Sequence, residues 1–337
     1  MLIHFYSPID KKTIKKIEKW NIEKEYYKFG HGVGHNIFEF YKRLKILKNS
    51  SIGPEIPDNC DIVIIFSKHF NNHSDFLKLK KLNCKVIRIF SDDRPKKFFF
   101  IKNLINISPY SFDNKKIKNH FNEIDSIYHI RTNNYTWIPH FIQRGIKSRK
   151  SKFSKKKLNL GFFGNKHNIP KFLNKKKLLK LSFNLKINET PKKWNNYSNI
   201  HIAICAVTSD DKLNKFIKPP TKTLNAISAN VIPLANNILA NKIIIKNYVN
   251  GFIYNNEKSF YKILKYISNN QHILKKINKT NEVIRGNYNN NMILDYWLKL
   301  FEKKNKHIKI SNLIYICIFL EKLKKLLKSI FKFFKTN

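Results

Sequence analysis

Two lysines, two prolines and a threonine gather in the short stretch 218–222, whose sequence is KPPTK. An apolar run at 200–207 precedes it and predicts a buried strand, and the pattern at 224–229 predicts a helix. Proline is tolerated in the first turn of a helix, because its missing N–H would be unpaired there anyway. The free N–H groups and the dipole of a helix start favour an anion, and Lys218 and Lys222 lie on either side of this start. We therefore expect a binding site for a phosphate or diphosphate. A surface helix with two solvated lysines is the alternative.

A glycine-rich stretch near the N-terminus is the second candidate. Residues 29–36 have the sequence FGHGVGHN and contain three of the nine glycines of the chain, Gly32 and Gly34 among them. A predicted helix follows at 37–47. Glycine lets the backbone approach a ligand closely, and the start of the next helix favours an anion. The spacing matches neither a phosphate loop nor a dinucleotide fingerprint, so a tight turn with two surface histidines, His31 and His35, is the alternative.

Adjacent carboxylates follow a predicted strand of the N-terminal half. The runs 61–66 (DIVIIF) and 85–90 (KVIRIF) are strongly apolar and predict central parallel strands. The second run leads into Asp92 and Asp93. Groups at the carboxyl ends of such strands lie on the ligand side of an α/β sheet. Either aspartate is therefore a candidate base, and capping of a turn is the alternative.

The remaining pattern indicates two α/β halves. Further strands are predicted at 2–6, 160–164, 231–235 and 249–253, and helices at 170–185, 258–268, 272–285 and 291–303. A length of 337 residues suits two domains of ordinary size. We expect an N-terminal domain at 1–143, a basic linker at 144–157, a second domain at 158–290, a helix at 291–305 that returns to the first domain, and a tail at 306–337.

The composition argues for a globular protein with a strongly positive surface. Hydrophobic residues make up 42% of the chain, and the formal net charge is +44. Most of the positive charge is lysine, whereas arginine is the preferred reader of bases and phosphates, so we expect no specific nucleic-acid partner. The four cysteines form no C-x-x-C pair, which indicates thiols in a reducing, cytoplasmic compartment. The N-terminus predicts a first strand instead of a signal peptide.

The tail 306–337 has an amphipathic pattern. Its apolar run 313–320 is too short to span a bilayer, which takes about 20 residues. Leucines, Ile330 and Phe334 then recur at helical spacing, with lysines on the remaining face. Such a helix is expected to lie in the interface of an anionic membrane, on the inner face of the plasma membrane. A terminal helix packed on the protein's own core is the alternative.

Four motifs occur in an order that resembles a known family. They are WIPHFIQ at 137–143, FFG at 162–164, WNNYS at 194–198 and KPPTKTLNA at 218–226. Together with the NG turn at Asn250, this order resembles glycosyltransferases of the GT-B fold. The similarity is closer to a bacterial, cyanobacterial-type group of such proteins. It covers about residues 137–300.

The resemblance implies two doubly wound Rossmann-like α/β domains that face a cleft. It implies a metal-independent glycosyltransferase of the hexosyl class with no cofactor, which uses a nucleotide-sugar as substrate and a surface-glycan or lipid-linked acceptor. The implied donor-binding residues are Lys218, Thr221, Lys222, Asn225 and Gly164. The implied catalytic residues are His69 and His35. The implied acceptor-side residues are Gly32, Gly34, Asp92 and His140. The acidic pairs lack the D-x-D spacing of metal-dependent transferases, so we expect no metal.

The chain departs from the usual GT-B pattern at the donor helix. Two glutamates commonly flank that helix, but Asn225 stands in place of the second and no glutamate lies near Ile217. A sugar-nucleotide-binding protein without turnover is therefore one alternative function. A polyanion-binding or nucleic-acid-binding protein, suggested by charge alone, is the other.

Overall fold

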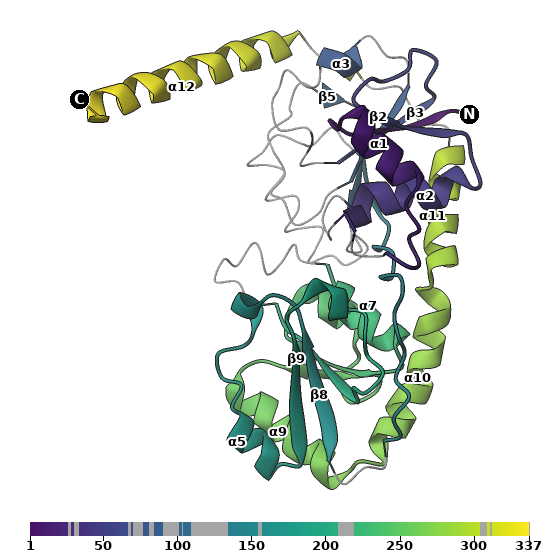
Figure 1. Ribbon diagram of the computed structural model, residues 1–337, viewed down its shortest axis with the longest axis vertical. Coiled ribbons are helices and arrows are strands. Elements are labelled where there is room, and N and C mark those ends of the chain that lie inside the picture. Colours follow the sequence, from purple (N-terminus) through teal and green to yellow (C-terminus); the bar gives the residue numbers. More distant parts are fainter. Residues whose placement is uncertain are drawn as a thin grey trace. The chain divides into compact units, whose positions relative to one another are not determined.

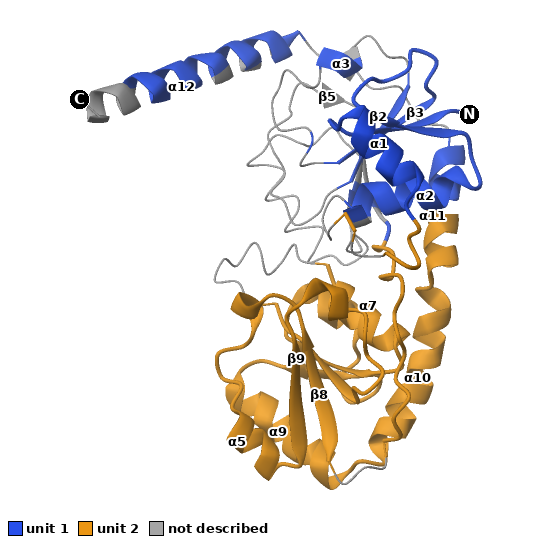
Figure 2. Ribbon diagram, viewed as in Figure 1, with its two compact units in different colours: residues 1–20, 32–138, 298–337 blue, residues 21–31, 139–297 orange. Residues whose placement is uncertain are grey.

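The computed structural model describes residues 1–25, 28–29, 34–66, 69, 77–80, 84–89, 101–102, 104–108, 134–153, 157–207, 219–303, 309–310 and 312–336 (Figure 1). The chain forms two compact units (Figure 2). Unit 1 comprises Met1–Trp20, Gly32–Ile138 and Leu298–Asn337, and unit 2 comprises Asn21–His31 and Pro139–Trp297. The segments 21–31 and 139–143, which the sequence analysis places in the N-terminal domain, are thus grouped with unit 2.

Unit 1 is built on a six-stranded parallel sheet with the order β2-β1-β3-β4-β6-β7. These strands are β1 (Ile3–Tyr6), β2 (Ser50–Gly53), β3 (Ile62–Phe66), β4 (Lys85–Ile89), β6 (Ile105–Ser108) and β7 (Asn134–Trp137). All five residues of β3, IVIIF, are buried, as expected for a parallel strand covered on both faces. A small antiparallel pair joins β5 (Ile101–Lys102) to β13 (Lys309–Ile310).

Helices cover both faces of this sheet. The helices of unit 1 are α1 (Lys11–Glu18), a π-helix η1 (Gly34–Glu39), α2 (Phe40–Lys45), α3 (Leu77–Lys80) and α12 (Leu313–Thr336). On one face Phe5 of β1 meets the ring of Phe40 edge-on, with 5.1 Å between the ring centroids. On the other face Val63 and Val86 form a buried cluster with Leu79 of α3 and Ile314 of α12. The core of unit 1 is therefore a sandwich of helix, sheet and helix.

Helix α11 (Asn290–Glu302) contributes residues up to Trp297 to unit 2 and the rest to unit 1. The ammonium of Lys85 caps its C-terminal end, donating to the carbonyl oxygens of Leu300, Phe301 and Lys303 at 3.2, 2.8 and 2.8 Å. A cation at this end of a helix is stabilised by the unpaired carbonyls and the helix dipole. This contact fixes the end of the helix to the first residue of β4.

Unit 2 has a five-stranded parallel sheet with the order β12-β11-β10-β8-β9. Its strands are β8 (Leu158–Phe163), β9 (Phe183–Asn188), β10 (Ile202–Cys205), β11 (Ile232–Asn236) and β12 (Phe252–Tyr254). Its helices are α5 (Lys175–Lys180), α7 (Thr221–Ser228), α8 (Leu239–Ile244), α9 (Glu257–Asn269) and α10 (Ile273–Asn287), with short 3-10 turns at Lys166–Asn168 and Pro191–Lys193. The predicted helix 170–185 is wrong in part: it is a six-residue helix followed by the strand β9.

The two faces of this sheet are packed differently. One face carries large side chains, such as Leu160, Phe162 and Leu234, which pack with α9 and α10 around Phe260. On the other face β10 and β11 carry small side chains, and Ala203 and Ala235 lie in one buried cluster with Ala226 of α7 and Ala229 at its C-cap. Small side chains let the backbone of a helix approach a sheet closely. Helix α7 is thereby held firmly above β10 and β11.

The stretch predicted as a linker, 144–157, is bound to unit 2 over its described part. Backbone bonds of 2.8 Å join Lys147 N to Asn195 O and Arg149 N to Ala229 O. The guanidinium of Arg149 donates to Asn230 O at 2.7 Å, which satisfies a carbonyl just beyond the end of α7. This stretch therefore supports the C-terminal end of α7 from outside.

Candidate functional site

The strand order of unit 2 defines where a ligand would bind. If the five strands are numbered 1 to 5 from β8 to β12, they lie side by side in the order 2-1-3-4-5. The connection after β8 therefore runs toward one edge of the sheet, and the connection after β10 runs toward the other edge. Open α/β sheets bind ligands outside the carboxyl ends of the strands at such a reversal. Gly164 follows β8 there, and Ala206 follows β10. These two residues mark the centre of the candidate donor site.

The ammonium of Lys222 lies at this point. It donates a hydrogen bond to the carbonyl oxygen of Ala206 at 3.1 Å and lies 4.6 Å from the centre of the Phe162 ring. Gly164 has a φ of +148°, and a Cβ atom built on it would be 3.2 Å from Lys222 Nζ. Glycine is thus favoured at this position by the backbone conformation, and a larger residue would also crowd the ammonium of Lys222. The positive charge is held where β8, β10 and α7 converge.

Helix α7 supplies the second element of the site. It begins at Thr221, with Pro220 at its N-cap, and among the described residues no side chain caps it. The N–H groups of its first turn therefore lack a partner inside the helix and are suited to an anion. An ammonium and a helix start at one position can stabilise the negative charge that develops on a departing diphosphate.

Buried polar contacts with neighbouring segments fix the first turns of α7. Asn225 donates to Gln143 Oε1 at 3.0 Å and accepts from the backbone N–H of Gln143 at 3.2 Å. Thr223 Oγ1 donates to Asn241 Oδ1 at 2.8 Å. Gln143 belongs to the predicted WIPHFIQ motif, and its partner Asn225 to KPPTKTLNA. The structure thus joins these two motifs through one pair of side chains.

Cys205, at the end of β10, is fully buried and raises the question of a nucleophile. Burial raises the pKa of its thiol to about 12, although Thr223 and the charge of Lys222 act in the opposite direction. A thiol in this state is inert near neutral pH. Cys60, Cys84 and Cys205 are all free and buried, as predicted from their sequence context.

The strand order of the sheet in unit 1 also reverses, between β1 and β3, and His69 follows β3 at this point. Its backbone N–H donates to Phe66 O at 2.8 Å, and its ring meets the Phe66 ring edge-on. Burial lowers the pKa of the imidazole, and a hydrogen bond with the backbone of Tyr6 partly opposes this shift. The Nδ1 atom is buried and has no hydrogen-bond partner among the described residues. A neutral imidazole can accept a proton from a hydroxyl that comes within hydrogen-bond reach of a ring nitrogen.

Ser7 is a neighbouring group that the sequence did not indicate. It follows β1 directly and is fully buried, and within the described part of the chain its hydroxyl has no hydrogen-bond partner. Its position at the end of a strand was the available signal, but a single serine after a strand is too common to single out.

The other predicted site residues are placed only in part. Lys218, Gly32 and Asp92 lie outside the described residues. Gly34 begins the π-helix η1, and the backbone of His35 is its second residue. π-Helices are rare and are frequent at functional sites. His140 is partly buried and lies in unit 2. The structure therefore brings Gly164 and Lys222 together within unit 2, with Thr221 and Asn225 on the same helix as Lys222, and His69 belongs to unit 1.

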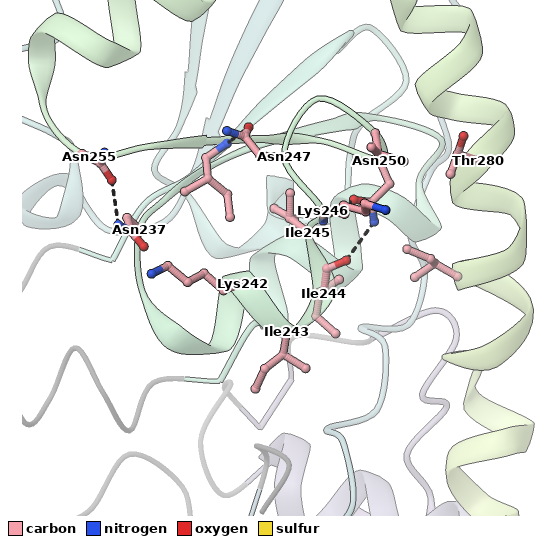
Figure 3. A pocket seen from close by; sticks show the side chains of 13 residues that line it. Asn237, Lys242, Ile243, Ile244, Ile245, Lys246, Asn247, Asn250, Asn255 and Thr280 are labelled. Atoms are coloured by element: carbon pink, nitrogen blue, oxygen red, sulfur yellow. Dashed lines mark hydrogen bonds between the residues drawn. The ribbon is translucent and has the colours of Figure 1, made fainter. Parts of the chain in front are cut away.

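A cavity of about 730 Å³ lies beside α8 in unit 2 and contains none of the predicted donor residues (Figure 3). Its amide side chains are already engaged: Asn237 donates to Asn255 at 2.7 Å, and Asn250 donates to the carbonyl of Ile244 at 2.8 Å. We favour the position of Lys222 as the site, because it combines a held charge, a helix start and the reversal of strand order. Among the described residues, no three His, Cys, Asp and Glu side chains group as metal ligands.

Comparison with known proteins supports the fold. No protein-family model and no curated protein matches the chain. A glycosyltransferase from Rickettsia africae superposes with a TM-score of 0.51 at 13% identity, over 89% of this chain and 97% of that one. The DNA-modifying enzyme β-glucosyltransferase superposes with a TM-score of 0.51 at 14% identity, over 90% and 100%. The pneumococcal O-GlcNAc transferase GtfA superposes with a TM-score of 0.47 at 13% identity over 79% of this chain. The match covers 59% of the length of GtfA.

The chain therefore has the GT-B fold of glycosyltransferases, with two parallel α/β sheets. The predicted fold class is confirmed. The narrower resemblance to a cyanobacterial-type group stays a prediction. No helix within the described stretches combines the length and the apolar character needed to cross a membrane.

Proposed function

We propose that the protein is a glycosyltransferase that moves a hexose from a nucleotide-sugar donor to a hydroxyl of a surface-glycan or lipid-linked acceptor. Unit 2 binds the donor and also carries His140, and unit 1 supplies the other acceptor-side groups. The observation that carries the proposal is the position of Lys222, whose ammonium lies between Gly164, Ala206 and the start of α7. The names of the two fold neighbours with a TM-score of 0.51 agree with it, and one of them was crystallised with uridine diphosphoglucose.

Each group has a role in the proposed reaction. Lys222 and the first N–H groups of α7 neutralise the nucleoside diphosphate as it leaves, and Lys218 adds charge to this seat. His69 accepts the proton of the attacking hydroxyl, with His35 as the second candidate. No metal ion is needed where two cationic elements already face the leaving group. Free buried thiols favour action in the cytoplasm.

A sugar-nucleotide-binding protein without turnover is the second candidate. The observation that favours it is the engagement of Asn225 by Gln143, since Asn225 stands where the usual pattern has a glutamate. A binding protein would retain the donor-binding site but would release no nucleoside diphosphate. Turnover therefore separates the two functions, whereas binding does not.

The test is a thermal-shift panel of UDP-, GDP- and ADP-sugars with single-stranded RNA and duplex DNA, followed by an assay for released nucleoside diphosphate. A ligand that binds the native state stabilises it by RT ln(1 + [L]/Kd) and thereby raises Tm. We expect one class of nucleotide-sugar to raise Tm and to be consumed, with equal rates in the presence of a chelator. A shift with nucleic acid alone would instead support polyanion binding.

The matched variants are Lys222→Met and Lys258→Met. Both remove one positive charge from unit 2, but Lys258 is an exposed residue of α9. A charge-assisted hydrogen bond contributes about 1.5–3 kcal/mol, so Lys222→Met should weaken donor binding roughly ten- to a hundredfold. Lys258→Met should leave it unchanged. Equal donor affinity in both variants would exclude the site.

A further inference from the structure

The C-terminal helix α12 (Leu313–Thr336), in yellow in Figure 1, is attached to unit 1 by its first turns. The side chain of Ile314 is fully buried in the cluster that contains Leu79 and Val86, and Ile318 packs against the same cluster. These two isoleucines are four residues apart and hence lie on one side of the helix. This side is the one that the protein's own core covers.

A different side of α12 carries a continuous row of large apolar side chains. At about 100° per residue this row, which we call the apolar stripe, lies roughly opposite Ile314 and Ile318. Its described members are Ile316, Phe319, Leu320, Leu323, Leu326, Leu327 and Ile330, and each exposes between 41% and 64% of its surface. The apolar stripe faces away from the described core that packs against α12. Packing within the described part of unit 1 therefore does not explain it. Contiguous exposed apolar surface of this kind marks an interaction site.

The charge on the rest of the helix shows what kind of surface would cover the stripe. Lys322, Lys324, Lys325 and Lys328 are exposed and lie outside the stripe, and Glu321 is the single acidic residue in the sequence 313–336. Helical spacing places Lys332 and Lys335 outside the stripe as well. An apolar face bordered by lysines suits the boundary between the acyl chains and headgroups of an anionic membrane.

We propose that α12 lies in the plane of an anionic lipid interface, with its apolar stripe in the membrane and its lysines among the headgroups. A second copy of the helix is a poorer partner, because joining two stripes would bring the bordering lysines of both copies together. Ile314 and Ile318 connect the helix to unit 1, so the membrane would hold the unit that carries His69. A membrane-embedded acceptor follows, and that part rests on the proposed transferase function.

The test uses the full chain and vesicles of phosphatidylcholine with or without phosphatidylglycerol. A protein with a net charge of +44 binds anionic vesicles through charge alone, so the deciding variant keeps every charge. Leu323→Gln with Leu327→Gln removes two members of the stripe and preserves helix propensity. The matched control is Ile46→Gln with Val283→Gln, which removes two apolar side chains that are 81% and 69% exposed outside α12.

We expect the wild-type chain and the control to sediment with the anionic vesicles, less so as salt rises. The stripe variant should have a partition coefficient lower by about tenfold or more for each leucine replaced. Its donor binding should be unchanged, so a failed donor assay and a failed membrane assay are distinct results. Equal sedimentation of the stripe variant and the wild type would overturn the proposal. A dimer in the absence of lipid that the stripe variant converts to monomer would overturn it too.

Discussion

A Cβ atom on Gly164 would lie 3.2 Å from the Nζ atom of Lys222, at a backbone φ of +148°. The missing side chain thus permits the conformation that ends β8 and leaves room beside the ammonium. At a contact of 3.2 Å the lysine would have to move by a few tenths of an ångström. The φ value disfavours any L side chain whatever the space.

We therefore predict that Gly164→Ala lowers the free energy of unfolding by about 1–3 kcal/mol and weakens donor binding. The matched control is Gly286→Ala in α10, where a Cβ atom meets nothing within 4 Å. Alanine there should stabilise the protein by up to about 1 kcal/mol. Urea unfolding and donor titration measure both effects. If Gly164→Ala binds the donor like the wild type, the glycine does not shape the site.

The sequence predicted those parts of the fold in which one local signal dominates. The buried runs 61–66 and 85–90 became β3 and β4, because parallel strands that are covered on both faces are apolar throughout. Strand β9 was missed. Its residues FNLKIN are only partly buried at an edge of the sheet, and the apolar residues Leu178 and Leu179 before it suggested a longer helix.

The candidate donor site could be predicted only in outline. The helix start and Lys222 have a sequence signature, since prolines precede a helical pattern after a buried strand. The partners of the ammonium, Ala206 O and the Phe162 ring, depend on the sheet order, which brings β8 beside β10. The pair Asn225–Gln143 joins residues 82 positions apart, and no local pattern encodes such a contact.

This pair permits a test of the role of Asn225. Its side chain is buried and exchanges two hydrogen bonds with Gln143. Asn225→Ala leaves the Gln143 groups unpaired, so we predict a loss of about 1–3 kcal/mol in the free energy of unfolding. Gln143→Ala keeps the backbone N–H that donates to Asn225, so it should cost less, and the double variant should cost less than the sum. The resemblance implies a donor contact instead: loss of donor affinity in folded Asn225→Ala, with normal affinity in Gln143→Ala, would support it.

The partly buried imidazole of His69 predicts a characteristic pH dependence of turnover. Burial lowers its pKa below the ordinary value of 6.5, so the neutral form that accepts a proton extends to lower pH than for a free histidine. We predict that the acidic fall of kcat/KM has its midpoint below pH 6.5. His69→Gln should lower kcat by about 10²–10⁴-fold with little change in donor affinity. His167→Gln, which alters an exposed histidine of unit 2, is the control. Normal turnover by His69→Gln would remove it from the mechanism.

The buried histidine His4 contributes to the pH dependence of the stability of unit 1. His4 on β1 contacts Ser51 Oγ at 2.9 Å and the Gly53 carbonyl at 3.2 Å. The carbonyl only accepts, so the Nε2 atom of His4 carries the proton and Nδ1 accepts from Ser51. Burial lowers the pKa of His4 from 6.5 to about 4, against the opposing effect of the Gly53 hydrogen bond. The folded state therefore keeps this imidazole neutral at a pH where the unfolded chain protonates it.

The sign of the stability change follows from this difference. Between the two pKa values the unfolded state binds one more proton, so His4 makes the protein less stable as pH falls through 6.5 toward 4. For a pKa near 4, acidification from pH 7.5 to 5 should cost about 2 kcal/mol through this residue. Urea unfolding of the wild type and of His4→Gln at both pH values isolates this contribution, because the other histidines are common to both. An equal loss in the two proteins would mean that His4 titrates normally in the folded state.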